Sequence, residues 1–382
     1  MRMVAPIVLS IFIGVVVGIS GVILWQKTQT PIPFFTPNPT PTPEPERPLL
    51  RYTFEQLRST EVAPTAVSLS ADDISSDEGV RTFIYSSTPL GRKMSGVVNL
   101  PATVTASTSA IIMLRGYVPP NQYAPGVGTK NAARVLAQAG FVTIAPDFFG
   151  YGDSEAEPTD EWQARFEKPL TVISLLKGLR TTGFTLPDGT GFTPKSIGLW
   201  GHSNGGQIAL SSLAILQEPI PTALWAPVTA PFPYSILYFS DEEADEGKQS
   251  RKWISLFDNL YDARQFSFTN YLDGLRGPLQ LQQGTNDDAV LKWWSDEFVQ
   301  KLKVENERRA EVMKLQEKES RASDSASATE TLTSEQAVAT PAGALEPIVY
   351  DYFVYQGADH NMRPDWDSVV AKDVEFFTRE LR

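Results

Sequence analysis

The sequence has no cysteine and only two histidines among its 382 residues. Without cysteine the chain can form neither disulfide bonds nor thiolate nucleophiles, and sulfur-based metal sites are excluded with them. The two histidines, His202 and His360, lack the HxH or HxxxH spacing of a zinc site. We therefore predict neither a metal ion nor another cofactor.

The sequence also lacks a cluster of basic residues. It has 33 Lys and Arg against 45 Asp and Glu, a formal net charge of -12. Nucleic-acid binding depends on clustered cations that release counterions from phosphate, so a nucleic-acid partner is not expected. The hydrophobic fraction of 42% is enough for a sizeable core, which excludes disorder of the whole chain.

Positions 3–26 at the N-terminus contain no charged residue. About 22 residues at a rise of 1.5 Å match the ~30 Å hydrocarbon layer of a bilayer. No small-x-small cleavage site follows, so residues 1–27 are predicted to form an uncleaved transmembrane signal-anchor. Residues 28–49 form a Pro/Thr-rich linker with eight prolines between 31 and 48, which predicts an extended stalk. We expect a single-pass membrane protein with its main domain outside the cytoplasm.

Residues 50–382 have the pattern of one α/β domain, in which short apolar runs alternate with helical segments. The predicted strands are 79–87, 93–102, 109–116, 141–147, 196–200, 221–227, 277–284 and 346–357, and the predicted helices are 131–140, 161–180, 204–216 and 290–320. The first two strands read as an antiparallel pair. The alternation that follows predicts a mostly parallel sheet with helices on both faces and a ligand site at the carboxyl ends of its strands.

Two segments interrupt this pattern. Residues 229–268 are aromatic and acidic without strand periodicity, which predicts a helical cap above the carboxyl edge of the sheet. Residues 320–345 are polar and rich in Ser, Thr and Ala, so they offer little apolar surface to offset the entropy of ordering. We predict a disordered loop there.

The segment "GHSNGG", residues 201–206, lies between a predicted buried strand and a predicted helix. In a GxSxG turn the serine adopts a strained conformation that raises its hydroxyl above the sheet edge. Five residues of this type also occur in ordinary glycine-rich loops. The flanking strand and helix favour Ser203 as a nucleophile.

A serine hydroxyl needs a base to take its proton. His360 follows the last predicted strand, where a loop brings it to the same sheet edge as Ser203. His202 adjoins the serine, and neighbouring side chains at such a turn point apart, so we expect it to pack and not to act as the base. The alternative for His360 is an isolated surface histidine.

The base in turn needs a carboxylate that holds its tautomer. Asp287 and Asp288 follow the penultimate strand, the expected place if the chain order is Ser, Asp, His. We favour Asp287, because it comes first after the turn, whereas Asp288 suits the start of the next helix. Asp359 is expected to shape the loop.

Stabilisation of a tetrahedral intermediate requires N–H donors. One is expected from the backbone of Asn204 at a helix N-terminus, and the other from the backbone of Tyr117, after the strand at 109–116. Arg115 is either an edge residue of the sheet or a cation near the substrate carbonyl. Tyr117 and Tyr123 are alternatively wall residues of the pocket.

Together these residues resemble the α/β-hydrolase fold. The closest resemblance within it is to catalytic domains of the prolyl oligopeptidase (S9) family, including bacterial acylaminoacyl-peptidase-like hydrolases. The resemblance covers about residues 80–382. The sequence blocks on which it rests are "IIMLRGYVPPNQY", "GFVTIAPDFFGYGDSE", "GLWGHSNGG", "LQLQQGTNDDAV" and "YQGADHNM". It implies a triad of Ser203, Asp287 and His360. The sequence departs from the family in having Arg115 where a histidine is usual, and in having no room for a β-propeller before the domain.

The expected function is that of a membrane-anchored serine hydrolase acting on a small peptide or an acyl ester. The resemblance implies a peptidase, and the alternative is a carboxylesterase acting on cell-surface or carbohydrate acyl groups. A catalytically silent binding protein with the same fold is the third possibility. The sequence gives no indication of oligomeric state.

Overall fold

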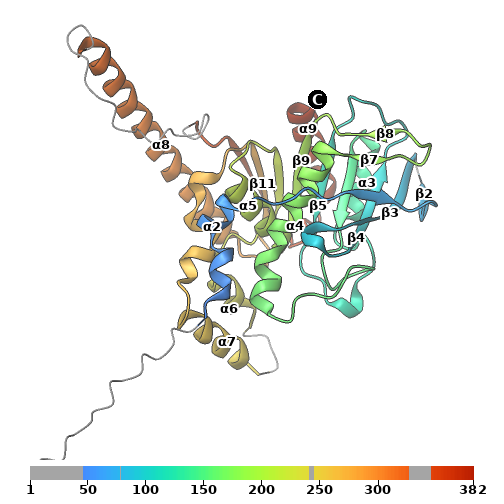
Figure 1. The fold of residues 1–382 in the computed structure, drawn as a ribbon, viewed down its shortest axis with the longest axis horizontal. Coiled ribbons are helices and arrows are strands. Elements are labelled where there is room, and N and C mark those ends of the chain that lie inside the picture. Colours follow the sequence, from blue (N-terminus) through green and yellow to red (C-terminus); the bar gives the residue numbers. More distant parts are fainter. Residues whose placement is uncertain (1–45, 78, 241–244, 327–345) are drawn as a thin grey trace, which may run out of the picture. The chain divides into compact units, whose positions relative to one another are not determined.

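The computed structural model describes residues 46–77, 79–240, 245–326 and 346–382 (Figure 1). The predicted membrane anchor at 1–27 and nearly all of the linker lie outside these residues. None of the helices in the described ranges combines the length and the apolar character needed to cross a bilayer. Leu49, the last residue of the predicted linker, is buried in the folded unit that starts at Arg47.

A ten-stranded sheet forms the centre of this unit, in the order β1-β3-β4-β6-β5-β9-β10-β11-β12, with β2 paired to β3. Every pair from β6 to β12 is parallel, and the pairs among β1 to β4 and between β4 and β6 are antiparallel. The strands are β1 (Val67–Leu69), β2 (Ser75–Asp77), β3 (Val80–Ser87), β4 (Met94–Leu100), β5 (Ala110–Leu114), β6 (Val142–Pro146), β9 (Ile197–His202), β10 (Thr222–Trp225), β11 (Leu279–Gly284) and β12 (Tyr350–Tyr355). The predicted α/β class with a mostly parallel sheet is confirmed.

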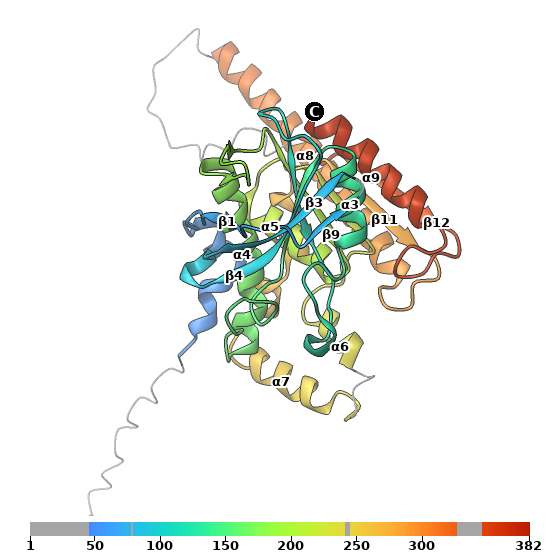
Figure 2. The ribbon, with the colours of Figure 1, turned by 90° about the vertical axis from the view of Figure 1, so that its right-hand side faces the viewer.

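Helices cover both faces of this sheet (Figure 2). Helices α4 (Glu161–Thr181) and α5 (Asn204–Leu216) contribute to one apolar cluster, and α3 (Lys130–Gln138) and α9 (Trp366–Leu381) to the other. Because the central strands are buried on both faces, they read as continuous apolar runs in the sequence.

One buried carboxylate fastens α9 to three adjacent strands. The side chain of Asp373 accepts hydrogen bonds from Trp200 Nε1 (2.9 Å), Trp225 Nε1 (2.8 Å), Gln280 Nε2 (2.8 Å) and Gln282 Nε2 (2.7 Å). Burial raises its pKa to about 8, against the opposing effect of the four donors. A sequence pattern gives no sign of this connection, because its five residues are far apart in the chain.

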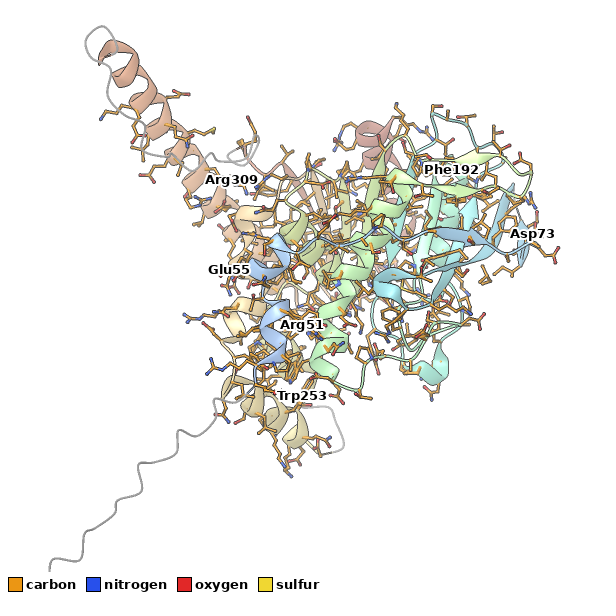
Figure 3. The ribbon with its side chains drawn as sticks, viewed as in Figure 1. Arg51, Glu55, Asp73, Phe192, Trp253 and Arg309 are labelled. Atoms are coloured by element: carbon orange, nitrogen blue, oxygen red, sulfur yellow. The ribbon has the colours of Figure 1, made fainter. Side chains whose placement is uncertain are left out.

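The segment between β10 and β11 contains the helices α6 (Tyr234–Ser240) and α7 (Lys248–Asp258) and the 3₁₀ turns η4 (Ala263–Phe266), η5 (Phe268–Asn270) and η6 (Leu272–Gly274). Trp253 of α7, labelled in Figure 3, stacks on Trp162 of α4 with ring centroids 3.5 Å apart. The segment is also tied to the N-terminal turn η1 (Pro48–Tyr52), since the N–H of Leu49 donates to the hydroxyl of Tyr261.

The structure corrects several element predictions. Helix α8 (Lys292–Ala326) continues six residues past the predicted end at 320, so the first part of the predicted loop at 320–345 is helical. The remainder of that loop, 327–345, lies outside the described residues. Elements that the sequence analysis did not predict are α9, η1, α2 (Phe54–Ser59), the short strands β1 and β2, the turns η2 (Pro89–Gly91) and η3 (Pro120–Gln122), and the small hairpin of β7 (Phe184–Thr185) and β8 (Gly191–Phe192).

Candidate active site

Ser203 occupies a sharp turn between β9 and α5. Its backbone has φ 57° and ψ -122°, a conformation that L-residues rarely adopt. The turn forms because α5 lies directly against the neighbouring strand, where a Cβ atom at Gly205 would overlap the carbonyl oxygen of Leu114. The backbone of Ser203 therefore adopts the strained conformation, and its side chain lies at the carboxyl edge of the sheet.

His360 and Asp287 meet at the same edge. The Nδ1 atom of His360 lies 2.9 Å from Oδ2 and 3.1 Å from Oδ1 of Asp287. These residues follow β12 and β11, whose parallel pairing brings their carboxyl ends together. Since Nδ1 faces the carboxylate, Nε2 is the ring nitrogen left for a substrate or a nucleophile.

His202 connects the loop that carries His360 to the turn at Ser203. The rings of His202 and His360 have centroids 4.7 Å apart, and His202 immediately precedes the serine. In the described part of the chain, no hydrogen bond joins Ser203 Oγ to His360 Nε2. Such contacts are often long in the absence of substrate and tighten when substrate binds.

Asp287 is held rigidly by its surroundings. Its Oδ1 accepts from the backbone N–H groups of Ala289 (3.0 Å) and Val290 (2.8 Å), and its Oδ2 accepts from Gln283 Nε2 (3.1 Å). Its side chain is fully buried, whereas the neighbouring Asp288 is exposed. Of the two carboxylates considered from the sequence, the structure brings Asp287 to the histidine.

His202 has a different environment. Its Nε2 lies 2.9 Å from the backbone carbonyl of His360, and because a carbonyl only accepts, that nitrogen carries the proton. Burial, followed by the proximity of His360, lowers the pKa of His202 to about 4. It is neutral at physiological pH and positions the loop of His360, consistent with the expectation that it packs.

Asp359 shapes that same loop from the other side. Its Oδ1 accepts from the backbone N–H groups of Asn361 (2.9 Å) and Arg363 (2.8 Å). This agrees with the structural role expected for it.

The residue after β5 closest to the nucleophile is Gly116, which the sequence analysis did not single out. A Cβ atom there would lie 3.0 Å from Ser203 Cβ and 3.5 Å from Ser203 Oγ. The carbonyl of Gly116 accepts a hydrogen bond from Arg115, so the N–H of Tyr117 in the same trans peptide points the opposite way. The first N–H of α5, that of Asn204, has no acceptor within its helix. The only sequence signal for Gly116 is that a glycine directly follows a buried strand.

Arg115 connects the loop after β5 to the loop after β6. Its guanidinium donates to the carbonyls of Gly116 (2.9 Å) and Asp147 (2.9 Å) and lies over the rings of Tyr151 and Tyr123. It is 6% exposed, which fits the expected sheet-edge role better than that of a cation at a substrate carbonyl. The side chain of Tyr117, in contrast, is 71% exposed and lines the pocket described next.

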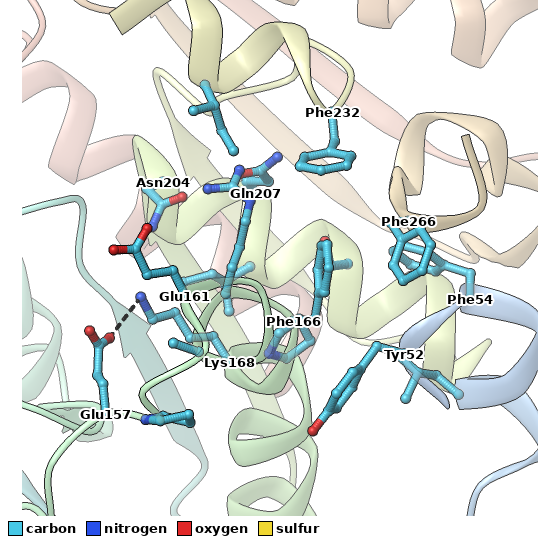
Figure 4. A pocket seen from close by; sticks show the side chains of 18 of the residues that line it. Tyr52, Phe54, Glu157, Glu161, Phe166, Lys168, Asn204, Gln207, Phe232 and Phe266 are labelled. Atoms are coloured by element: carbon cyan, nitrogen blue, oxygen red, sulfur yellow. Dashed lines mark hydrogen bonds and ion pairs between the residues drawn. The ribbon is translucent and has the colours of Figure 1, made fainter. Parts of the chain in front are cut away.

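A cavity of about 370 Å³ opens at Asn204, the residue after Ser203, although Ser203 and His360 are not among its lining residues (Figure 4). Asn204 lies at one end of it, and the facing sides of α4 and α5 form its walls. Its apolar part is largely aromatic, with Phe166, Phe232, Trp253 and Phe266 among the lining residues. Its charged lining residues come from α4 and the loop before it. The sequence analysis predicted a pocket at this edge but not this contribution from α4.

The described residues contain no group of three or more His, Asp or Glu side chains arranged to hold a metal ion. An imidazole held by a carboxylate and a serine in a strained turn at the same sheet edge are the groups that proton transfer from a serine hydroxyl requires.

Comparison with known proteins gives fold-level likeness only. No family model matches the sequence, and no curated protein matches it. Among solved structures, acetyl xylan esterase 1 from Thermoanaerobacterium sp. JW/SL YS485 is 15% identical, with a TM-score of 0.49 over 86% of this chain and 92% of that one. Est1E from Butyrivibrio proteoclasticus with bound ferulic acid is 13% identical, with a TM-score of 0.46 over 76% and 96% of the two chains.

An esterase from Pyrococcus furiosus is 18% identical, with a TM-score of 0.45 over 77% of this chain and 90% of that one. Identities at this level do not carry a function from one protein to another. The function of this chain is therefore argued from the residues of its own site.

Proposed function

We propose that this chain is a serine hydrolase that cleaves carboxylic esters through an acyl-enzyme, with Ser203 as nucleophile, His360 as base and Asp287 as the residue that orients the base. The observation that carries the proposal is the strained turn at Ser203 together with the His360–Asp287 pair on the adjoining loops. Strain of this kind persists where the surrounding structure imposes it, and it is frequent at catalytic residues.

In this mechanism Ser203 Oγ attacks the ester carbonyl while His360 Nε2 accepts its proton. The imidazolium that forms is stabilised by Asp287, whose remaining lone pairs are already occupied by backbone donors. The proton then passes to the departing alcohol. Water hydrolyses the acyl-enzyme by the same steps in reverse, with His360 again acting first as base.

The backbone N–H groups of Asn204 and Tyr117 are the donors proposed for the oxyanion. Asn204 begins α5, so the helix dipole adds to its hydrogen bond. The absence of a side chain at Gly116 leaves space beside Ser203 Oγ for the substrate carbonyl. Donors fixed before the reaction need no reorganisation when the negative charge develops, which is the reason such sites accelerate acyl transfer.

The pocket favours an ester over a peptide. A bound peptide needs hydrogen-bonding partners for its backbone along several residues. The cavity next to Asn204 is instead a short recess whose inner walls are mainly aromatic and aliphatic side chains, which suits an acyl group. Peptide or amide cleavage is the second candidate, since the sequence blocks resemble the prolyl oligopeptidase family and the same residues can attack either bond.

We also propose that an N-terminal anchor holds the hydrolase at the membrane, with its folded domain outside the cytoplasm. The support is the uncharged segment at 3–26 followed by the proline-rich linker. This arrangement would place the active site near cell-surface esters.

Labelling of the full chain with a fluorophosphonate probe tests the nucleophile. Wild-type protein is expected to be labelled, and Ser203→Ala to lose the label while keeping its melting temperature. An unlabelled wild type would favour a silent binding protein. A panel of short acyl p-nitrophenyl esters against peptide p-nitroanilides then separates the two bond types, with greater kcat/KM on the esters as the expected result.

A further inference from the structure

The pocket at Asn204 contains a guanidinium that forms no ion pair with a carboxylate of the described residues. Arg165, on α4, lines this pocket and donates from Nη2 to the side-chain oxygen of Gln207 at 2.9 Å. Its guanidinium also lies 5.9 Å from the ring centre of Phe232. Among the residues that the structure describes, no Asp or Glu lies within ion-pair distance of it. Burial lowers the pKa of Arg165 to about 10, so it is still a cation at neutral pH.

The other charged groups of the pocket are accounted for. Lys168 and Glu157 form an ion pair with 3.2 Å between Nζ and Oε1, drawn as a dashed line in Figure 4. Glu161 is exposed and lies one helical turn before Arg165 on α4, without forming an ion pair with it. Within the described ranges, Arg165 is therefore the cation of this pocket that forms no ion pair, and the exposed carboxylate of Glu161 on the same helix disfavours a doubly charged ligand. These charges fit a monoanion such as a carboxylate.

The position of Arg165 suggests which part of a substrate would reach it. Its partner Gln207 follows Ser203 by four residues, about 6 Å along the axis of α5. An acyl group attached to Ser203 and lying along this face of the helix would bring its end toward Gln207 and Arg165. A chain of a few carbons covers this distance.

On the basis of the proposed function, we infer that the site takes esters whose acyl group ends in a carboxylate, and that Arg165 is the residue that selects them. Guanidinium groups bind carboxylates by paired, charge-assisted hydrogen bonds, which are stronger than bonds between neutral groups. The guanidinium of Arg165 is half-buried, so the protein has removed part of its hydration before any ligand arrives, and a ligand carboxylate would replace that lost hydration.

Matched esters test this inference. The p-nitrophenyl ester of valeric acid and the mono-p-nitrophenyl ester of glutaric acid have acyl chains of equal length and differ in the terminal carboxylate. We expect the wild type to have a kcat/KM about tenfold or more in favour of the glutarate ester. Arg165→Gln should abolish this preference, and Arg165→Lys, which keeps the charge but not the fork, should retain part of it. The control is Arg180→Gln on the same helix, since Arg180 is paired with Glu218 away from the pocket and its loss should leave the ratio unchanged.

Binding to Ser203→Ala separates this inference from the proposed function. Calorimetric titration with monomethyl glutarate and with methyl valerate should show tighter binding of the former, lost in the Ser203→Ala, Arg165→Gln double variant. If that holds while the wild type hydrolyses no ester, the carboxylate site stands and the hydrolase proposal fails. If the wild type hydrolyses both esters equally and neither assay shows a preference for the carboxylate, the role given to Arg165 is wrong and the hydrolase proposal stands.

Discussion

The Nε2 atom of His202 lies 2.9 Å from the backbone carbonyl oxygen of His360. The residue next to the proposed nucleophile thus holds the main chain of the proposed base. The histidine inside the GxSxG motif therefore connects the turn of the serine to the loop of the imidazole, and its low pKa keeps it neutral at physiological pH.

Replacing His202 tests this positioning role. His202→Phe keeps a ring of similar shape but removes the donor, so kcat is expected to fall about tenfold with little change in KM. His202→Gln, which can donate to the same carbonyl, should recover part of the loss. The pH dependence of kcat/KM should be similar in all three proteins, because each keeps the same proposed base, His360, and the same carboxylate, Asp287. If the His202→Phe variant were as active as the wild type, His202 would not be needed to position His360.

Asp287 and Asp288 form a natural matched pair for testing the acid. Asp287→Asn removes the charge that stabilises the imidazolium and allows the wrong tautomer of His360, so kcat is expected to fall by about 10³- to 10⁴-fold. Asp288→Asn changes an exposed carboxylate with no contact to the histidine, and activity should be nearly unchanged. Equal losses in the two variants, measured on the same ester, would contradict the assignment of the acid.

Much of the sheet and the three proposed catalytic residues could be predicted from the sequence. Strands buried on both faces are continuous apolar runs, and the motif around Ser203 depends on local backbone geometry that glycines reveal. His360 was identifiable because the chain has only two histidines.

The features that sequence reasoning missed depend on contacts between distant segments. Helix α9 has an amphipathic pattern, but its attachment depends on Asp373 meeting side chains from three strands. In the sequence Arg165 is an ordinary helical arginine, and only the fold shows that it lines the pocket and forms no ion pair with the carboxylates that the structure describes. The true end of α8 was also missed, because its last turn has the same polar composition as the segment after it.

Removing the N-terminal segment tests whether it anchors the protein to a membrane. A chain lacking residues 1–46 retains the whole folded unit from Arg47 onward. We expect the full chain to sediment with membranes and to resist extraction by high salt and carbonate, since a helix spanning a bilayer is held by the hydrophobic effect and not by charge. The shortened chain should remain in the supernatant with unchanged esterase activity. Recovery of the full chain in the supernatant would contradict the anchor.

The raised pKa of Asp373 predicts that the stability of the folded domain depends on pH. In the unfolded chain this carboxyl titrates near pH 4. A folded-state pKa of about 8 means that the folded protein binds the proton more tightly, so the contribution of this group to stability is complete below about pH 4 and is lost as the pH rises through 8. The domain should therefore lose stability on this account between pH 5 and pH 9.

Asp373→Asn isolates this effect, because an amide does not titrate. The variant should melt below the wild type at every pH, since its NH₂ group would face donors from the tryptophan or glutamine side chains and leave them without an acceptor. The difference in melting temperature should be larger at pH 5 than at pH 9, because only the wild type loses stability as the pH rises. Asp367→Asn, an exposed change in the first turn of the same helix, is the control and should show no such trend. A difference that widens with pH would mean that the four donors, and not burial, determine the charge of this group.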